Sequence, residues 1–172
     1  GRESTLDLAA DLGAELVGFS WGPFESREQL LEDARLYNEI GQQCRDRGLR
    51  LCYHNHNHEF QQFDGQSALE ILLDNADPEL LGLQLDVAWA AFGRADPAAL
   101  IRHYGPRISA LHMKDLERIP DGGNTGNDER KETRFTEVGT GVVPIAACVE
   151  AAREHNIPWL DVEQDRLNQL GP

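Results

Sequence analysis

Hydrophobic and polar positions follow two different periods along the chain. Apolar residues three and four positions apart predict amphipathic helices, the longest over residues 27–47, and short apolar runs bounded by Gly or Pro predict strands. The expected helices cover residues 4–12, 27–47, 67–75, 96–103 and 143–155, and the expected strands cover 15–21, 49–54, 81–86, 108–112 and 158–163. This alternation predicts parallel βα units, and therefore an α/β fold.

Polar side chains stand at the ends of the four strands that follow the first. These strand endings carry His54, Asp86, His112 and Glu163. The carboxyl ends of parallel strands lie at one edge of a sheet, and active sites collect there. We therefore expect these four side chains to converge if the sheet curls into a barrel.

The segment from Tyr53 to Phe60 is the richest in candidate chemistry, because it holds three histidines, two asparagines and a glutamate. In a regular strand, His54, His56 and His58 would share one face. Such a face suits metal binding or acid–base catalysis. The alternative is a polar strand end with solvated histidines.

Composition and charge narrow the class of protein. The chain has 172 residues, 40% of them hydrophobic, and a formal net charge of −14, which opposes binding to nucleic-acid phosphates. No apolar run approaches the ~20 residues of a membrane-spanning helix. The scattered Cys44, Cys52 and Cys148 form no C-x-x-C pair, which favours a reducing, cytoplasmic setting over disulfides or a zinc–thiolate site.

Five ordered motifs carry a resemblance to a known family. They are Tyr53-His54-Asn55-His56 with Glu59-Phe60, Leu85-Asp86-Val87 with Ala88-Trp89, His112-Met113-Lys114-Asp115, Val138-Gly139-Thr140-Gly141 and Val162-Glu163-Gln164-Asp165. With these motifs the sequence resembles the sugar phosphate isomerase/epimerase family, within the xylose isomerase-like TIM barrel superfamily. The resemblance implies a (β/α) barrel of eight strands. Residues 1–172 would then form a single domain equivalent to the C-terminal portion, with about five βα units present and the first three missing.

The resemblance also implies a metal site with one ligand from each of four strands. Asp86, His112 and Glu163 match the last three ligands, and either His54 or Glu59 supplies the first. This set with open positions suits one divalent ion, Mn²⁺ or Mg²⁺ before Co²⁺ or Zn²⁺. A helix N-cap is the alternative role for Asp86.

Further residues are candidates for catalysis and substrate binding. Glu163 or His56 is the expected base, and Lys114 either binds a substrate oxygen or pairs with Asp115. The expected substrate-binding residues are His54, Asn57, Trp89, Lys114 and Arg134. The Gly139-Thr140-Gly141 motif is either a turn or a place where backbone approaches the substrate.

Three functions remain open at this stage. The first is a metal-dependent sugar isomerase or epimerase that acts on a keto sugar through an enediolate. The second is a dehydratase or lyase of an inosose or 3-keto sugar at the same metal site, and the third is a non-catalytic accessory subunit with a partial barrel. The superfamily also contains abasic-site endonucleases, which the negative charge opposes.

Two expectations concern the whole chain. The polar loop over residues 120–133 is expected to act as a lid over the site. Five strands cannot close an eight-stranded barrel, so we expect a homo-oligomer or a missing N-terminal barrel half. The strand residues expected to lack packing partners are Val17, Leu51, Leu83, Leu85, Ile108 and Leu160.

Overall fold

The fold is known from a computed structural model, which describes residues 1–119, 121 and 133–164. Its helices are α1 (Arg2–Asp11), α2 (Arg27–Arg45), α3 (Ala68–Asn75), α4 (Val87–Phe92), α5 (Pro97–Tyr104) and α6 (Ile145–Glu154), with 3₁₀ turns η1 (His58–Phe60) and η2 (Gly105–Arg107). Its strands are β1 (Leu16–Phe19), β2 (Arg50–His54), β3 (Gln62–Phe63), β4 (Gln66–Ser67), β5 (Leu81–Asp86), β6 (Ile108–Met113), β7 (Asp115–Leu116), β8 (Phe135–Thr136) and β9 (Leu160–Val162).

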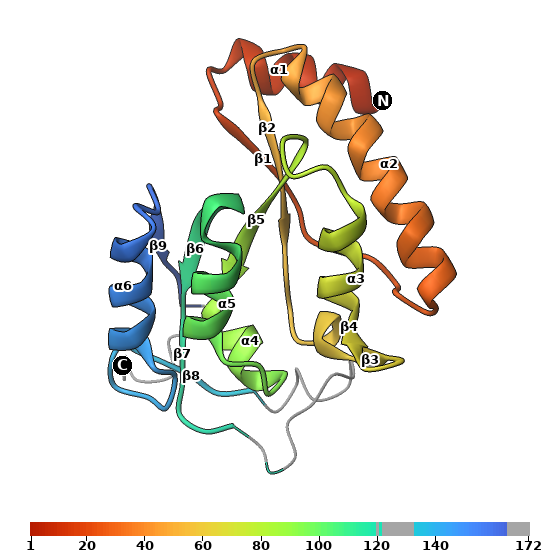
Figure 1. Ribbon diagram of the computed structural model, residues 1–172. Coiled ribbons are helices and arrows are strands. Elements are labelled where there is room, and N and C mark those ends of the chain that lie inside the picture. The colour runs from red at the N-terminus through yellow and green to blue at the C-terminus, as the bar shows by residue number, and fades with distance from the viewer. Residues whose placement is uncertain (120, 122–132, 165–172) are drawn as a thin grey trace.

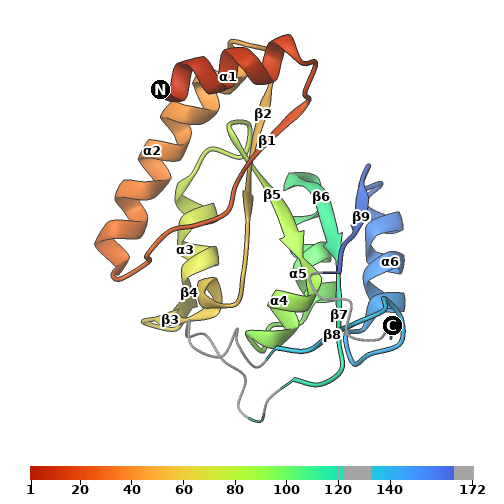
Figure 2. The same ribbon diagram turned by 180° about the vertical axis from the view of Figure 1, so that it is seen from behind.

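Five strands form one parallel sheet, in the order β1-β2-β5-β6-β9. The two views in Figures 1 and 2 show α2, α3, α5 and α6 along one face of this sheet. Each of the first four strands of the sheet is followed by helical structure that returns the chain to the start of the next strand. The predicted βα alternation is therefore confirmed, and the sheet has the open form of an incomplete barrel.

Three of the helices begin at capping side chains that the sequence supplies. The Ser26 hydroxyl accepts the Gln29 N–H at the start of α2, and Ser67 with Glu70 forms a reciprocal capping box at the start of α3. Asp96 caps α5 just before Pro97. Proline suits the first helical position because it has no N–H, and an N–H at that position would have no partner within the helix. These local contacts explain why the predicted starts of α2, α3 and α5 agree with the observed ones to within a residue.

The core lies where the helices cover the three central strands. Leu51, Leu83, Leu85 and Ile108 are buried there, so the expectation that they lack packing partners is wrong. All four side chains belong to the hydrophobic core. Val17 on β1 is half-buried and Leu160 on β9 is 40% exposed, so among the six residues in question only the two on the edge strands are incompletely buried.

Short elements that the sequence did not predict lie beyond the carboxyl ends of the sheet strands. They are helix α4 and the antiparallel pairs β3–β4 and β7–β8 (Figure 1). They surround the edge of the sheet where the polar strand endings meet. The expected lid falls outside the described residues, apart from Asp121 and Thr133.

Within the described part of the chain, no helix combines the length and the hydrophobicity that crossing a membrane requires.

Candidate metal and sugar site

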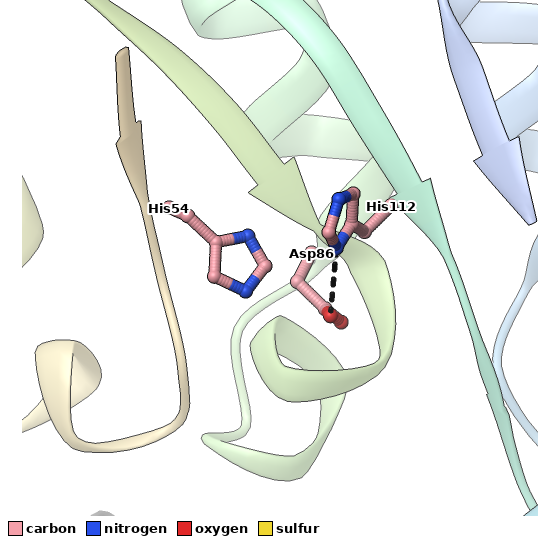
Figure 3. A group of neighbouring side chains, drawn as sticks. All are labelled: His54, Asp86 and His112. Atoms are coloured by element: carbon pink, nitrogen blue, oxygen red, sulfur yellow. Dashed lines mark ion pairs between the residues drawn. The ribbon is translucent and has the colours of Figure 1, made fainter. Parts of the chain in front are cut away.

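Three strand endings meet at one point of the sheet. His54 ends β2, Asp86 ends β5 and His112 lies near the end of β6, and each offers a ligand atom within 4.8 Å of the others (Figure 3). The polar endings converge because the three strands are parallel neighbours, with Asp86 directly opposite His112 in the register. Two imidazoles and a carboxylate at this spacing are a donor set that fits a divalent transition metal.

The two oxygens of the Asp86 carboxylate make different contacts. Oδ1 accepts the backbone N–H groups of Ala88 and Trp89 at 3.0 and 2.9 Å, which caps helix α4. Oδ2 lies 3.4 Å from Lys114 Nζ and 4.0 Å from His112 Nδ1. The two roles that the sequence left as alternatives, helix cap and site carboxylate, are thus held by one side chain.

Burial dominates the electrostatics of Asp86. The side chain is fully buried, which raises its pKa from 3.8 to about 7 because the charged form is desolvated. The Lys114 ammonium and the two backbone N–H donors act in the opposite direction. A buried carboxylate at the end of a strand, next to two imidazoles, is typical of a functional site.

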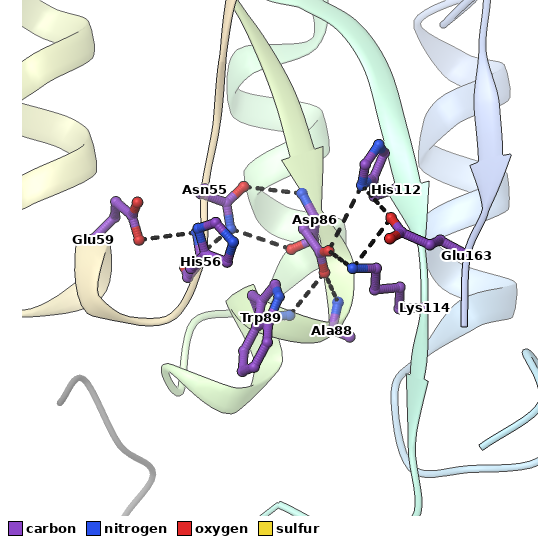
Figure 4. A network of polar contacts seen from close by, with 9 residues as sticks. All are labelled: Asn55, His56, Glu59, Asp86, Ala88, Trp89, His112, Lys114 and Glu163. Carbon is purple, nitrogen blue, oxygen red and sulfur yellow. Dashed lines mark hydrogen bonds and ion pairs between the residues drawn. The ribbon is translucent and has the colours of Figure 1, made fainter. Parts of the chain in front are cut away.

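Lys114 and Glu163 extend the cluster toward the edge strand β9. Glu163 follows β9, and its Oε2 lies 3.2 Å from Lys114 Nζ and 3.0 Å from His112 Nδ1 (Figure 4). The Lys114 residue is only 4% exposed, whereas the Glu163 side chain keeps 42% of its surface accessible. The structure therefore brings together His54, Asp86, His112, Lys114 and Glu163, all of which the sequence singled out.

The three histidines do not share a strand face, because the regular strand on which that expectation depended ends at the first of them. Strand β2 ends at His54, and the chain turns into η1 at His58. The ring of His54 lies 4.5 Å from the His112 ring, whereas His58 faces away and its Nε2 lies 3.0 Å from the carbonyl oxygen of Gly22. The strand ends at His54, where the sequence predicted its end, so a regular strand does not extend through His56 and His58.

Glu59 is held behind the cluster. Its Oε1 accepts the Tyr53 hydroxyl at 2.6 Å, and its Oε2 accepts the His56 backbone N–H at 2.9 Å and lies 3.3 Å from His58 Nδ1. Both carboxylate oxygens are thereby engaged by β2 and by the segment that follows it. Of the two candidates for the first ligand, the geometry places His54 rather than Glu59 among the other donors.

Asn55 is a site residue that sequence reasoning missed. Its Oδ1 accepts the Asp86 N–H at 2.9 Å, and its amide donates to the carbonyl oxygens of Asp86 and His56 at 3.3 and 3.2 Å (Figure 4). The side chain is completely buried, and it joins the ends of β2 and β5. Its sequence signals are its place directly after an apolar strand and its position in the first of the five motifs.

Aromatic rings surround the cluster. The His56 ring lies 5.9 Å from Trp89 and 6.3 Å from Trp21, and Trp89 lies 5.5 Å from Phe135. Trp21 is 45% exposed, so it offers an accessible apolar surface at the end of β1 that the sequence reading did not assign to the site. Such faces suit the C–H surface of a sugar.

Two other predicted substrate-binding residues lie on segments outside the strands that carry the cluster. Arg134 precedes β8 and its side chain is exposed, and Asn57 is buried at the start of η1.

The glycine-containing motif at residues 138–141 forms a turn that is held by Asp115. The Asp115 carboxylate accepts the backbone N–H groups of Gly139, Gly141 and Val143 at 2.9, 2.9 and 3.0 Å, as well as that of Leu116. Asp115 is therefore committed to the backbone rather than to Lys114. The turn is thereby fixed to the segment that follows β6, directly after His112 and Lys114 in the chain.

The fold is an open parallel sheet, and donor groups that suit a metal ion converge at the ends of its strands. These two features define the protein as a partial (β/α) barrel with a site at the carboxyl ends of its strands. The chain matches the family described as xylose isomerase-like TIM barrel over residues 3–169, and it belongs to that family. The resemblance drawn from the five motifs is thus confirmed.

Known relatives show what kinds of protein the chain is similar to. An inosose dehydratase of Bacillus anthracis (strain CDC 684 / NRRL 3495) is 30% identical over 135 residues, which is 75% of this chain and 45% of the relative. The chain therefore spans about half the length of the curated relatives it matches.

Solved structures agree on the fold. A sugar phosphate isomerase/epimerase from Parabacteroides distasonis ATCC 8503 superposes with a TM-score of 0.81 at 24% identity, over 99% of this chain and 57% of the other. The IOLI protein, whose structure is described as binding a zinc atom, superposes with a TM-score of 0.74 at 18% identity, over 96% of this chain and 59% of the other.

Proposed function

We propose that this chain carries the metal site of an enzyme that removes the proton alpha to the carbonyl of a keto sugar or sugar derivative. The main observation behind the proposal is that the fully buried Asp86 lies between His54 and His112, with Lys114 and Glu163 beside it. Isomerisation or epimerisation through an enediolate is the reaction that this group suits. Family membership supports the proposal.

The donor atoms fit one divalent ion. His54, Asp86 and His112 would hold it, and Glu163 would complete the set from β9. Two imidazoles shift the preference from Mg²⁺ toward Mn²⁺, Co²⁺ or Zn²⁺, while the carboxylates keep Mn²⁺ favourable. A bound ion would polarise the substrate carbonyl and stabilise negative charge on adjacent oxygens.

Side chains of the chain itself would handle the proton and the substrate. Glu163 or His56 is the base, because Glu163 is the accessible carboxylate of the cluster and His56 is an imidazole between two indole rings. Lys114 would bind a substrate oxygen, and Trp89 would pack on the sugar. His54, Asn57 and Arg134 remain proposed contacts to hydroxyl groups.

A dehydratase is the second candidate. It is favoured by relatives named inosose dehydratase that are 25–30% identical over parts of this chain. The same proton abstraction would be followed by loss of the hydroxyl group on the beta carbon, and Lys114 or His56 would supply the proton that leaves with it as water. A non-catalytic accessory role is the third reading.

Metal analysis tests the site. We expect Asp86→Ala to abolish bound divalent metal, because this change removes the central buried ligand. Asp96→Ala is the matched control, since Asp96 caps α5 through two backbone N–H groups as Asp86 caps α4, but stands outside the cluster. Unchanged metal content in Asp86→Ala would refute the assignment.

Solvent exchange tests the chemistry. Keto sugars and inososes are incubated with the metal-loaded protein in D₂O, and deuterium at the carbon next to the carbonyl is read by NMR. A rearranged sugar indicates isomerisation or epimerisation, and an unsaturated or deoxy product indicates dehydration. If His56→Ala and Glu163→Gln both keep full exchange, the proposed proton abstraction is wrong.

A further inference from the structure

Lys114 is a buried cation inside a group of candidate metal ligands. Its residue is 4% exposed, and its Nζ lies 3.4 Å from Asp86 Oδ2 and 3.2 Å from Glu163 Oε2. The ring of Phe135 lies 5.7 Å from the same nitrogen, which adds a cation–π contact. Phe135 and the strands around Lys114 therefore keep the ammonium beside the carboxylates instead of in water.

The oxygens that face Lys114 are the same ones that face His112. Asp86 Oδ2 lies 4.0 Å from His112 Nδ1, and Glu163 Oε2 lies 3.0 Å from it. Asp86 Oδ1 is already used by the backbone of α4, so Oδ2 is the oxygen that Asp86 can offer to a cation. An ion bound by His112 and these carboxylates would therefore share its oxygens with the ammonium (Figure 4).

Two opposite effects of Lys114 on metal binding are conceivable. As an orienting group, it would hold the carboxylates in place, and its removal would weaken metal binding. As a competing cation, it would repel the ion and occupy its oxygens, and its removal would tighten metal binding. The backbone N–H groups on Asp86 and the Asn55 side chain that joins the ends of β2 and β5 already fix Asp86 without Lys114. Competition should therefore dominate.

We propose that Lys114 is a built-in counter-ion that competes with the divalent ion for Asp86 and Glu163 and thereby lowers the metal affinity of the site. This inference rests on the proposed metal site. Its consequence is that metal binding releases Lys114 from the carboxylates, which makes its ammonium available to a substrate oxygen. Metal loading and substrate recognition would then be linked through one side chain.

Metal affinity of charge variants tests the proposal without a substrate. Dissociation constants for Mn²⁺ and Zn²⁺ are measured by competition with a fluorescent chelator for the wild type, Lys114→Met and Lys114→Arg. We expect Lys114→Met to bind at least about tenfold more tightly, because a positive charge within a few ångströms of the ion is lost. Lys114→Arg keeps the charge and should not gain affinity.

Arg102→Met is the matched control for net charge. Arg102 pairs with Glu154 on the exposed surface of α5 and α6, away from the cluster, so this variant should change metal affinity less than about twofold because solvent screens it. Equal or weaker binding by Lys114→Met would overturn the proposal, and so would equal tightening by Lys114→Arg. Lys114→Gln replaces Lys114→Met if circular dichroism shows that the latter is unfolded.

A separate measurement distinguishes failure of this inference from failure of the metal site itself. If Asp86→Ala binds metal as the wild type does, the site assignment falls and the inference falls with it. If Asp86→Ala loses the metal while Lys114→Met does not gain affinity, only the counter-ion role is wrong. NMR signals of the Lys114 Cε–Hε group should also shift on addition of one equivalent of Zn²⁺.

Discussion

Because Asp86 is buried, its carboxyl group binds a proton more tightly in the folded state than in the unfolded state. The pKa of this carboxyl is raised from 3.8 to about 7, chiefly by desolvation, while the Lys114 ammonium and the N–H groups of α4 limit the rise. Between these two pH values the folded state binds more protons than the unfolded state. The contribution of Asp86 to the free energy of unfolding is therefore fully present below pH 3.8 and is lost as the pH rises to about 7.

We accordingly expect a measurable pH slope from this one residue in the presence of a metal chelator. The free energy of unfolding of the wild type, relative to Asp86→Asn, should fall by on the order of 4 kcal/mol as the pH rises from below 4 to above 7. Asparagine can still cap α4, so the comparison isolates the ionisation. Urea denaturation at a series of pH values measures it, and parallel curves for the two proteins would contradict the prediction.

At the scale of elements, the segment after β2 shows how a buried carboxylate positions a loop. Glu59 accepts the Tyr53 hydroxyl and the His56 N–H, and His58 next to it reaches the backbone at Gly22. These contacts tie the segment between β2 and β3 both to β2 and to the segment that follows β1. The placement of His56 beside Trp89 depends on them.

Removing the Tyr53 hydroxyl should loosen this segment. We expect Tyr53→Phe to lower the free energy of unfolding by roughly 1.5–3 kcal/mol, because the buried Glu59 loses a charge-assisted hydrogen bond. Tyr104→Phe is the control, since in the described part of the chain the buried Tyr104 hydroxyl has no hydrogen-bond partner. Urea denaturation compares the two, and equal losses would show that the contact with Glu59 is not stabilising.

The turn at residues 138–141 requires glycine at position 141, because there is no room there for a side chain. A Cβ at Gly141 would lie 2.2 Å from the Leu116 carbonyl oxygen and 2.4 Å from Asp115 Oδ1. We expect Gly141→Ala to lower the free energy of unfolding by about 1–3 kcal/mol, because backbone must shift to admit the methyl group. Gly18→Ala, whose Cβ would meet its nearest neighbour at 3.8 Å, should have a smaller effect in thermal denaturation.

At the scale of the whole molecule, apolar side chains gather at the two edges of the sheet. Phe19 on β1 is 42% exposed, and Trp159, Leu160 and Val162 at β9 are 53%, 40% and 74% exposed. Unpaired strand edges with apolar side chains favour pairing with another chain. The covered centre and the exposed edges together support the proposal that this chain is one part of a larger barrel or assembly.

Light scattering on the 172-residue chain tests this proposal. We expect self-association or aggregation rather than a monodisperse monomer, because edge hydrogen-bonding groups and apolar side chains remain exposed. A double variant with Phe19→Lys and Val162→Lys should associate less, since charged edge residues oppose strand pairing. A monodisperse wild-type monomer that melts cooperatively would contradict the prediction.

The sequence by itself determined the order of strands and helices and the residues at the strand ends. These features are local: the hydrophobic period reports the type of element, and capping residues such as Ser67 and Asp96 mark where helices begin. Parallel strands place their carboxyl ends together, so the sequence alone groups His54, Asp86, His112 and Glu163.

The tertiary structure decided what local patterns do not encode. The bend after His54 separated His58 from the cluster and kept Glu59 behind it. Asn55 became a site residue through a contact across 31 positions of sequence. Such choices depend on distances between segments that are far apart in the chain. These contacts follow from packing and desolvation. The hydrophobic period, in contrast, indicates only which face of its own helix or strand a residue lies on.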